Sequence, residues 1–278
     1  MAKITVITPT WNQGEFIKDT IESVIHQTHK DLEYIIVDNC SDDGTQELVE
    51  SYRAQDERIV YVREKDHGQA EAINKGFRLA TGEIVCWLNS DDFYYDDSVL
   101  EKVNRHFEEG GEQVRLVVGD AWYCDKQKQM TQYNPSDRGV PDWVITRWYF
   151  IVQPAVFWRR TDICLDETYH YAFDWKFFIR LFGEGKVLYT HEAYAVYRMY
   201  EDNKTGQDNA KRKKEIYRLQ KEQGVSKLNT AWCKYVYHVY KKAENSGWPA
   251  EKQLKRKKQV DWWSRVLFHI TGKRICSF

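Results

Sequence analysis

Residues 86–97 read CWLNSDDFYYDD and place four carboxylates within seven residues, directly after a short apolar run. Acidic residues are common in turns and at helix starts, so the pair Asp91 and Asp92 can be a solvated turn. In a ligand site, by contrast, a divalent cation would neutralise both carboxylates. The segments around this stretch distinguish the two interpretations.

Short apolar runs alternate with helical patterns along the first 90 residues. Strands are predicted at 4–8, 32–38, 59–64 and 83–89, and apolar residues at helical spacing predict helices at 14–27, 43–55 and 68–80. Alternation at this spacing indicates parallel strands joined by right-handed crossovers. We therefore expect an α/β fold with a mostly parallel sheet flanked by helices.

Ligands of such sheets bind at the carboxyl ends of the strands. Polar clusters follow the four predicted strands at 9–14, 38–45, 64–69 and 89–94. Asp91 and Asp92 would then lie in the ligand crevice, where Mg²⁺ or Mn²⁺ could bridge them to phosphate oxygens. Neither GxGxxG nor GxxxxGK[ST] occurs, so the patterns of dinucleotide-binding and P-loop proteins are absent.

Four segments together resemble a known family. They are 6–45 (VITPTWNQGEFIKDTIESVIHQTHKDLEYIIVDNCSDDGT), 64–92 (EKDHGQAEAINKGFRLATGEIVCWLNSDD), 153–160 (QPAVFWRR) and 173–181 (FDWKFFIRL). Their order and spacing resemble those of family 2 glycosyltransferases with the Rossmann-like GT-A fold, over residues 3–205. The resemblance implies an inverting transfer of a sugar from a nucleotide-diphosphate donor, with Mn²⁺ or Mg²⁺ as cofactor.

The resemblance also implies which residues bind the donor. Those matching the nucleotide-base site are Pro9, Thr10, Trp11 and Asp38. An aromatic ring can stack on a base and a carboxylate can accept from the imide N–H of uracil or thymine. Trp11 could instead be a core residue, and Asp38 a cap of nearby amides. Asp66 and Gly68 match a further donor loop, although both are also common in ordinary turns.

The metal signature of the family, DxD, maps onto Asn89, Ser90 and Asp91, followed by Asp92. The first acidic position is thus an amide, which can still hydrogen-bond the ribose. We place the metal on Asp91 or Asp92, and the sequence leaves open which of them is the direct ligand. Tyr200 stands where the family often has a histidine, which weakens any case for a second protein ligand.

The general base implied by the resemblance is Asp174, in YHYAFDWKFFIRL (169–181). The apolar spacing after it predicts a helix that begins near this residue, so a carboxylate there could accept the proton of an acceptor hydroxyl. A plain helix N-cap is the alternative, and Asp166 is the reserve candidate for the base. The acidic residue that usually follows in the family is Lys176 here.

The chain divides into an acidic and a basic part. Residues 206–278 carry 18 Lys and Arg against 6 Asp and Glu, whereas residues 1–205 carry 23 against 36. We expect a glycosyltransferase domain at 1–205, with a nucleotide-sugar half at 1–110 and an acceptor half at 111–205. Residues 206–278 would form a basic, aromatic helical extension. The extension could contact an anionic membrane surface or pack on the acidic body.

The sequence and the resemblance together predict an enzyme of surface polysaccharide synthesis. A UDP-sugar is the preferred donor and a dTDP-sugar the alternative, with a saccharide or lipid-linked saccharide as acceptor. Sugar-nucleotide nucleotidyl transfer and non-catalytic nucleotide-sugar binding are the other functions considered. No apolar run of about 18 residues is present, so we expect a cytoplasmic protein, peripheral to the membrane at most. Nucleic-acid binding is not expected, because no recognition motif accompanies the basic charge.

Overall fold

The computed structural model describes residues 1–137, 139, 142–201, 203 and 210–225, and single positions beyond 225. The strands are β1 (Ile4–Thr10), β2 (Leu32–Asp38), β3 (Ile59–Arg63), β4 (Ile84–Trp87), β5 (Phe93–Tyr94), β6 (Val114–Cys124), β7 (Met130–Asn134), β8 (Val156–Arg159) and β9 (Lys186–Arg198). The helices are α1 (Ile17–Ile25), α2 (Thr45–Arg53), α3 (Gln69–Leu79), α4 (Val99–Gly110), α5 (Phe173–Leu181) and α6 (Ala210–Glu222), with short 3₁₀ turns η1 (Asp142–Thr146) and η2 (Gln153–Ala155).

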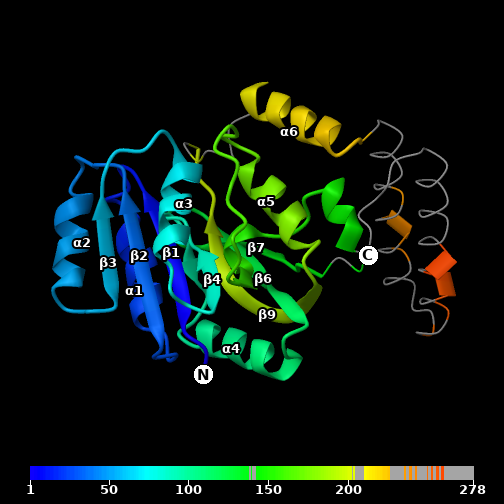
Figure 1. Cartoon of the computed structure of the whole chain (residues 1–278), viewed down its shortest axis with the longest axis horizontal. Helices are drawn as coiled ribbons and strands as arrows, with labels where there is room; N and C mark the ends of the chain where they lie inside the picture. Colours follow the sequence, from blue (N-terminus) through cyan, green and yellow to red (C-terminus); the bar gives the residue numbers. More distant parts are fainter. Residues whose placement is uncertain are drawn as a thin grey trace.

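The described strands form one sheet in the order β3-β2-β1-β4-β8-β6-β9-β5, with β7 beside β6 (Figure 1). The first four strands are parallel, which confirms the expected βα alternation. Right-handed crossovers place α1 and α2 on one face and α3 on the other, because the strand order reverses direction at β1. Such a reversal opens a ligand crevice at the carboxyl ends of β1 and β4.

The second half of the sheet is mixed. Strand β8 runs antiparallel to β4 and β6, whereas β6 and β9 are parallel. The long strand β9 then pairs antiparallel with the short strand β5, where Phe93 lies opposite Val196. The mostly parallel arrangement thus holds for the N-terminal half, and β9 joins the mixed half of the sheet to the acidic stretch after β4.

Strand β1 is buried along its whole length, as expected for a parallel strand covered on both faces. It extends two residues further than the sequence predicts, so that Pro9 and Thr10 are strand residues. Pro9 is tolerated because its nitrogen faces the side of β4, whose pairing with β1 ends at Ile7. Gly76 of α3 lies against Ile7, so a side chain there would collide with that residue.

An aromatic core anchors α5 to the sheet. The ring of Trp87 in β4 lies 5.5 Å from those of Trp158 in β8 and Phe178 in α5. Phe77 of α3 and Phe177 of α5 stack at 5.5 Å. Buried aromatic pairs of this geometry contribute about 0.5–1.5 kcal/mol each beyond their area burial. The packing fixes the position of α5, and with it the residues of its first turn.

Helix α6 confirms part of the predicted helical extension. Most of the rest of the predicted extension, after residue 225, lies outside the described residues. Within the part of the chain that is described, no helix has both the length and the apolar character needed to cross a membrane. The domain boundary between residues 205 and 206 stays a prediction.

Candidate active site

The loop after β1 is tied to the loop after β2 by hydrogen bonds. The backbone N–H of Asn12 donates to Ser41 Oγ at 2.9 Å, and that of Gly14 to Asp43 Oδ2 at 2.8 Å. Asn12 has a left-handed φ of 51°, which makes the turn sharp. Trp11 just before it is 62% exposed, so the alternative of a core residue is wrong. The indole is presented to solvent by a braced turn.

Asp38 ends β2 and is fully buried. Its Oδ1 accepts hydrogen bonds from the backbone N–H (3.0 Å) and the hydroxyl of Ser41, and its Oδ2 accepts from Tyr61 at 2.7 Å. Arg63 Nε lies 3.6 Å from Oδ2. Asp38 therefore caps its own loop, as the alternative interpretation expects. Its contact with a nucleotide base stays a prediction.

Residue Thr10, beside Asp38 across the paired strands, is also buried. Its Oγ1 makes no hydrogen bond to any described residue. Buried hydroxyls are nearly always hydrogen-bonded, so this oxygen is suited to a ligand or an ordered water. Pro9 is buried in the strand beside it.

The loop before α3 connects the loop after β2 to the end of β4. The backbone N–H of Asp66 donates to Asn39 Oδ1, and Asp66 Oδ1 accepts from the N–H of Gly68, both at 2.9 Å. Gly68 has a φ of 151°, which favours glycine, and α3 begins directly after it. Gln69 Nε2 then donates to Asn89 Oδ1 at 2.9 Å. The predicted loop is thus an Asp-Gly turn that lies beside Asn89.

Asp91 and Asp92 differ sharply in environment. Asp92 is fully buried, and its carboxylate accepts from the backbone N–H of Arg198 at 3.0 Å and from Asn89 Nδ2 at 3.2 Å. Asp91 is partly buried and accepts from the Tyr200 hydroxyl at 3.0 Å. Burial raises the pKa of both carboxyl groups, and the charge of Asp91 raises that of Asp92 further. The geometry favours Asp91 as the direct metal ligand and Asp92 as its support.

The residues present fit a metal ion only in company with a substrate. Among the described residues, no group of three or more His, Cys, Asp or Glu could hold a metal. Mg²⁺ is often bound through one or two carboxylates plus substrate phosphates, and Asp91 could supply such a carboxylate. The arrangement therefore suits a cation shared between Asp91 and a diphosphate.

Arg198 is a site residue that sequence analysis misses. Its side chain is buried, with Nη2 2.7 Å from Asp19 Oδ2 and its guanidinium 4.8 Å from the ring centre of Phe16. These contacts hold the end of β9 against α1, so that the N–H of Arg198 reaches Asp92. A charged residue that closes the largely apolar run 193–197 is the signal that could have revealed it.

Asp174 is the second residue of α5 and is partly buried. The N-cap residue is Ala172, so the alternative of a plain N-cap at Asp174 is wrong. Its Oδ1 accepts from the N–H of Trp175 at 2.7 Å. Burial, and then the charge of Asp174, raise the pKa of the Tyr149 hydroxyl. Asp174 thus lies in the first turn of α5 with one carboxylate oxygen engaged by its own helix.

Asp166, the reserve candidate, is held in an ion pair. Its Oδ2 lies 2.8 Å from Lys176 Nζ, and its Oδ1 accepts from the N–H of Thr168 at 3.0 Å. Burial opposes ionisation, but the hydrogen bonds from Lys176 and Thr168 lower the pKa of Asp166 to about 2. A carboxylate of such low pKa is a weak base near neutral pH. Asp174 is therefore the better candidate.

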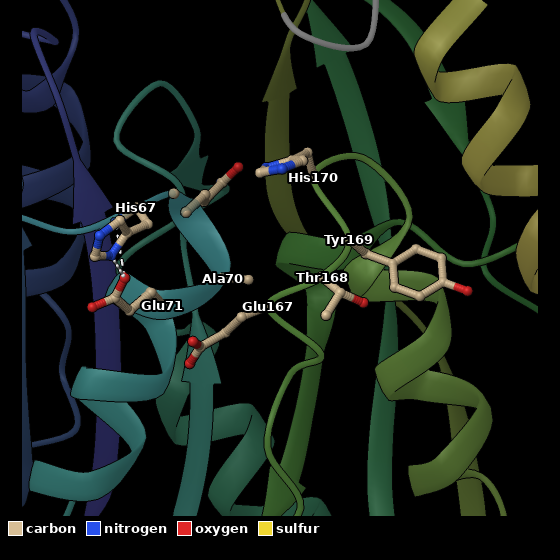
Figure 2. A pocket seen from close by; sticks show the side chains of 9 residues that line it. His67, Ala70, Glu71, Glu167, Thr168, Tyr169 and His170 are labelled. Carbon is tan, nitrogen blue, oxygen red and sulfur yellow. Dashed lines mark hydrogen bonds and ion pairs between the residues drawn. The ribbon is translucent and has the colours of Figure 1, made fainter.

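A pocket of about 230 Å³ lies between the start of α3 and the loop before α5. Figure 2 shows His67 and Glu71 on the α3 side, with Glu167, Thr168 and His170 on the loop opposite. His67 Nδ1 lies 2.8 Å from Glu71 Oε2. The pocket is lined mainly by polar side chains, which suits a ligand rich in hydroxyl groups.

Comparison with known families identifies the chain. The model of the family described as glycosyl transferase family 2 matches residues 5–204. The chain belongs to this family. The matched region contains every predicted site residue.

Two curated relatives show where the similarity is strongest. The chain is 45% identical over 100 residues to the putative teichuronic acid biosynthesis glycosyltransferase TuaG of Bacillus subtilis, covering 36% of this chain and 39% of TuaG. It is 28% identical over 132 residues to glycosyltransferase GlyA of Streptococcus pneumoniae, covering 48% of this chain and 18% of GlyA. The matches span less than half of either relative.

Solved structures share the fold at low sequence identity. S. aureus TarS 1–349 in complex with UDP-GlcNAc aligns with a TM-score of 0.64 and 18% identity, covering 93% of this chain and 79% of that one. The mannosyltransferase PcManGT from Pyrobaculum calidifontis, in complex with GDP-Man and Mn²⁺, aligns with a TM-score of 0.57 and 19% identity, covering 94% and 69%. At this identity the likeness establishes the GT-A-like fold.

The carboxylate pair gives a stability prediction. Because the pKa of Asp91 and of Asp92 is raised on folding, the folded protein holds these protons more tightly than the unfolded chain. Without metal, their contribution is therefore most favourable at low pH and falls as the pH rises above the ordinary carboxylate pKa of about 4. We expect Asp91→Asn to melt at a higher temperature than the wild type at pH 7 in EDTA.

Differential scanning fluorimetry measures this effect, with Asp97→Asn, an exposed residue of the same stretch, as the charge-matched control. UDP with Mn²⁺ should raise the melting temperature of the wild type and of Asp97→Asn, but not that of Asp91→Asn. A lower melting temperature of Asp91→Asn in EDTA would contradict the assignment.

Proposed function

We propose that this chain transfers a sugar, with inversion, from a UDP-sugar to a saccharide or lipid-linked saccharide during synthesis of a cell-surface polymer. A dTDP-sugar is the alternative donor. The proposal rests on the adjacent carboxylates Asp91 and Asp92, which lie where the strand order reverses and β1 and β4 open a ligand crevice. Family membership favours glycosyl transfer over nucleotidyl transfer.

The donor nucleotide would lie across the ends of β1 and β2. Trp11 offers an exposed ring for stacking on the base, and the unpaired Thr10 Oγ1 is available nearby. Asp38 would accept the imide N–H, while Ser41 and Tyr61 hold its carboxylate in place. The site so formed would select a pyrimidine base such as uracil.

The ribose and diphosphate would continue toward the end of β4. Asn89 lies beside Gln69 and can hydrogen-bond the ribose, and the Asp66–Gly68 turn allows close backbone approach. Asp91, oriented by Tyr200, would hold Mn²⁺ or Mg²⁺ together with the diphosphate oxygens. The cation would neutralise charge on the diphosphate leaving group.

Asp174 would act as the general base. As the acceptor oxygen forms its bond to the anomeric carbon, the carboxylate takes the hydroxyl proton, and the bond from that carbon to the diphosphate oxygen breaks. Attack opposite the leaving group inverts the anomeric configuration. Lys176, where the family usually has an acidic residue, is paired with Asp166, so no second carboxylate assists at that position.

The acceptor class rests on the relatives. TuaG is named for teichuronic acid biosynthesis, which supports a polymer of the cell surface as the product. Peripheral contact of residues 206–278 with an anionic membrane stays a prediction, since most of that segment lies outside the described residues. Salt-sensitive binding of the full chain to anionic vesicles would test it.

Binding of the nucleotide tests the donor site. Stacking of a base on an aromatic side chain contributes about 1–3 kcal/mol. We therefore expect Trp11→Ala to weaken UDP binding in Mn²⁺ by about 5- to 150-fold, whereas Trp11→Phe keeps most of the affinity. Isothermal titration calorimetry measures both, and both variants should melt like the wild type because Trp11 is exposed. Unchanged UDP affinity in Trp11→Ala would refute this placement of the base.

Turnover tests the chemistry. Asp174→Asn should leave UDP affinity unchanged but lower the rate of sugar transfer by about 10²–10⁴-fold. The rate of UDP-GlcNAc hydrolysis by water, measured without an acceptor, should fall by the same factor. Proton NMR of the product should show an anomeric configuration opposite to that of the donor. Retention of configuration would overturn the single-displacement mechanism, and absence of any turnover of UDP-sugars with Mn²⁺ would favour a non-catalytic binding protein.

A further inference from the structure

Helix α6 lies outside the region matched by the family model, yet it packs closely on the enzyme body (Figure 1). Leu219 on this helix is fully buried, and Ile216 packs against the core. Just beyond the helix, the carbonyl of Gln223 accepts from Arg147 Nη1 at 3.1 Å. The first helix of the basic extension is therefore part of the folded domain.

Glu215 of α6 binds the backbone that leads into α5. Its carboxylate accepts from the N–H groups of His170 at 2.9 Å, Tyr171 at 2.7 Å and Ala172 at 3.2 Å. Helix α5 has no side-chain cap of its own at Ala172. A carboxylate at this end of a helix satisfies unpaired amides and interacts favourably with the helix dipole. Glu215 thus holds the N-cap residue of α5 and the two residues before it.

Further side chains of α6 hold the same loop. Arg218 Nη2 donates to Thr168 Oγ1 at 3.1 Å, and its guanidinium lies 4.3 Å from the ring centre of Tyr169. Glu222 forms an ion pair with Lys176 of α5 at 2.8 Å. Lys176 Nζ in turn lies 4.7 Å from the Tyr169 ring centre. Side chains of α6 and α5 therefore contact the loop 166–172 along its length.

The loop 166–172 borders the pocket and leads into the first turn of α5. Glu167, Thr168 and His170 line the polar pocket opposite α3, while the ring of Tyr169 points away from the cavity (Figure 2). Two residues beyond the loop is Asp174, in the first turn of α5. The contacts of α6 thus fix the position of both a wall of the pocket and the residue proposed as the general base, Asp174.

We propose that α6 is a clamp of the acceptor side and that Glu215 is a positioning residue, which fixes the 166–172 loop and thereby the orientation of Asp174. This inference rests on the proposed function for its catalytic consequence. The clamp itself depends only on the contacts of α6. The two parts can therefore be tested separately.

Hydrogen–deuterium exchange of the full chain tests the clamp without any substrate. Loss of hydrogen bonds to a charged group should raise exchange at His170, Tyr171 and Ala172 by about 10- to 100-fold in Glu215→Ala. Glu215→Gln, which keeps one acceptor oxygen, should show a smaller increase. Tyr217→Ala, 68% exposed on the same helix, is the control and should match the wild type. Wild-type exchange at these amides in both Glu215 variants would overturn the clamp.

Hydrolysis of UDP-GlcNAc with Mn²⁺ tests the positioning role. Glu215→Ala should lower kcat by about tenfold with the donor KM within about twofold, and Glu215→Gln should recover part of the loss. In an Asp174→Asn background the same change should cost little more, because both residues act through one base. Fully multiplicative losses, or unchanged kcat, would overturn positioning through Asp174. Lack of wild-type turnover with every UDP-sugar and dTDP-sugar supplied would refute the proposed function, and the exchange result would still decide the clamp.

Discussion

Asp92 is buried without access to water, and a buried carboxylate must be hydrogen-bonded to be tolerated. Its donors come from separate parts of the chain, the N–H of Arg198 at the end of β9 and the amide of Asn89. Its own carbonyl accepts from Thr20 of α1 at 2.7 Å. The hydrogen bonds that Asp92 requires therefore join the two halves of the sheet at the end of β4. Asp91, the preceding residue, is only partly buried and accepts a hydrogen bond from Tyr200.

The hydrophobic pattern of the sequence was sufficient to predict those helices and strands that depend on short stretches of chain. The parallel half follows from apolar runs and helical spacing, each of which spans fewer than about 15 residues. The clustering of polar residues at strand ends follows from the sheet topology, because the carboxyl ends of parallel strands share one edge. Asp174 was placed correctly in the first turn of α5, since the apolar spacing of that helix is strong.

Features that depend on distant partners were beyond the sequence. The antiparallel strand β8 and the hydrogen bond from Tyr61 to Asp38 depend on tertiary pairing that no periodicity records. The departure at Lys176 looked like a missing carboxylate, whereas the structure gives it two partners, Asp166 and Glu222. Lys176 thus lacks the carboxylate that the family usually has at this position, but it binds α6, a helix more than thirty residues later in the chain.

The contacts of Glu215 are to backbone N–H groups, which every residue except proline possesses. The side chains of Glu167 and His170, which face the pocket, take no part in those hydrogen bonds to Glu215. Substitution of His170 would change the lining of the pocket while the backbone hydrogen bonds to Glu215 remain. Attachment through the main chain therefore makes the position of the loop independent of which side chain stands at this pocket position.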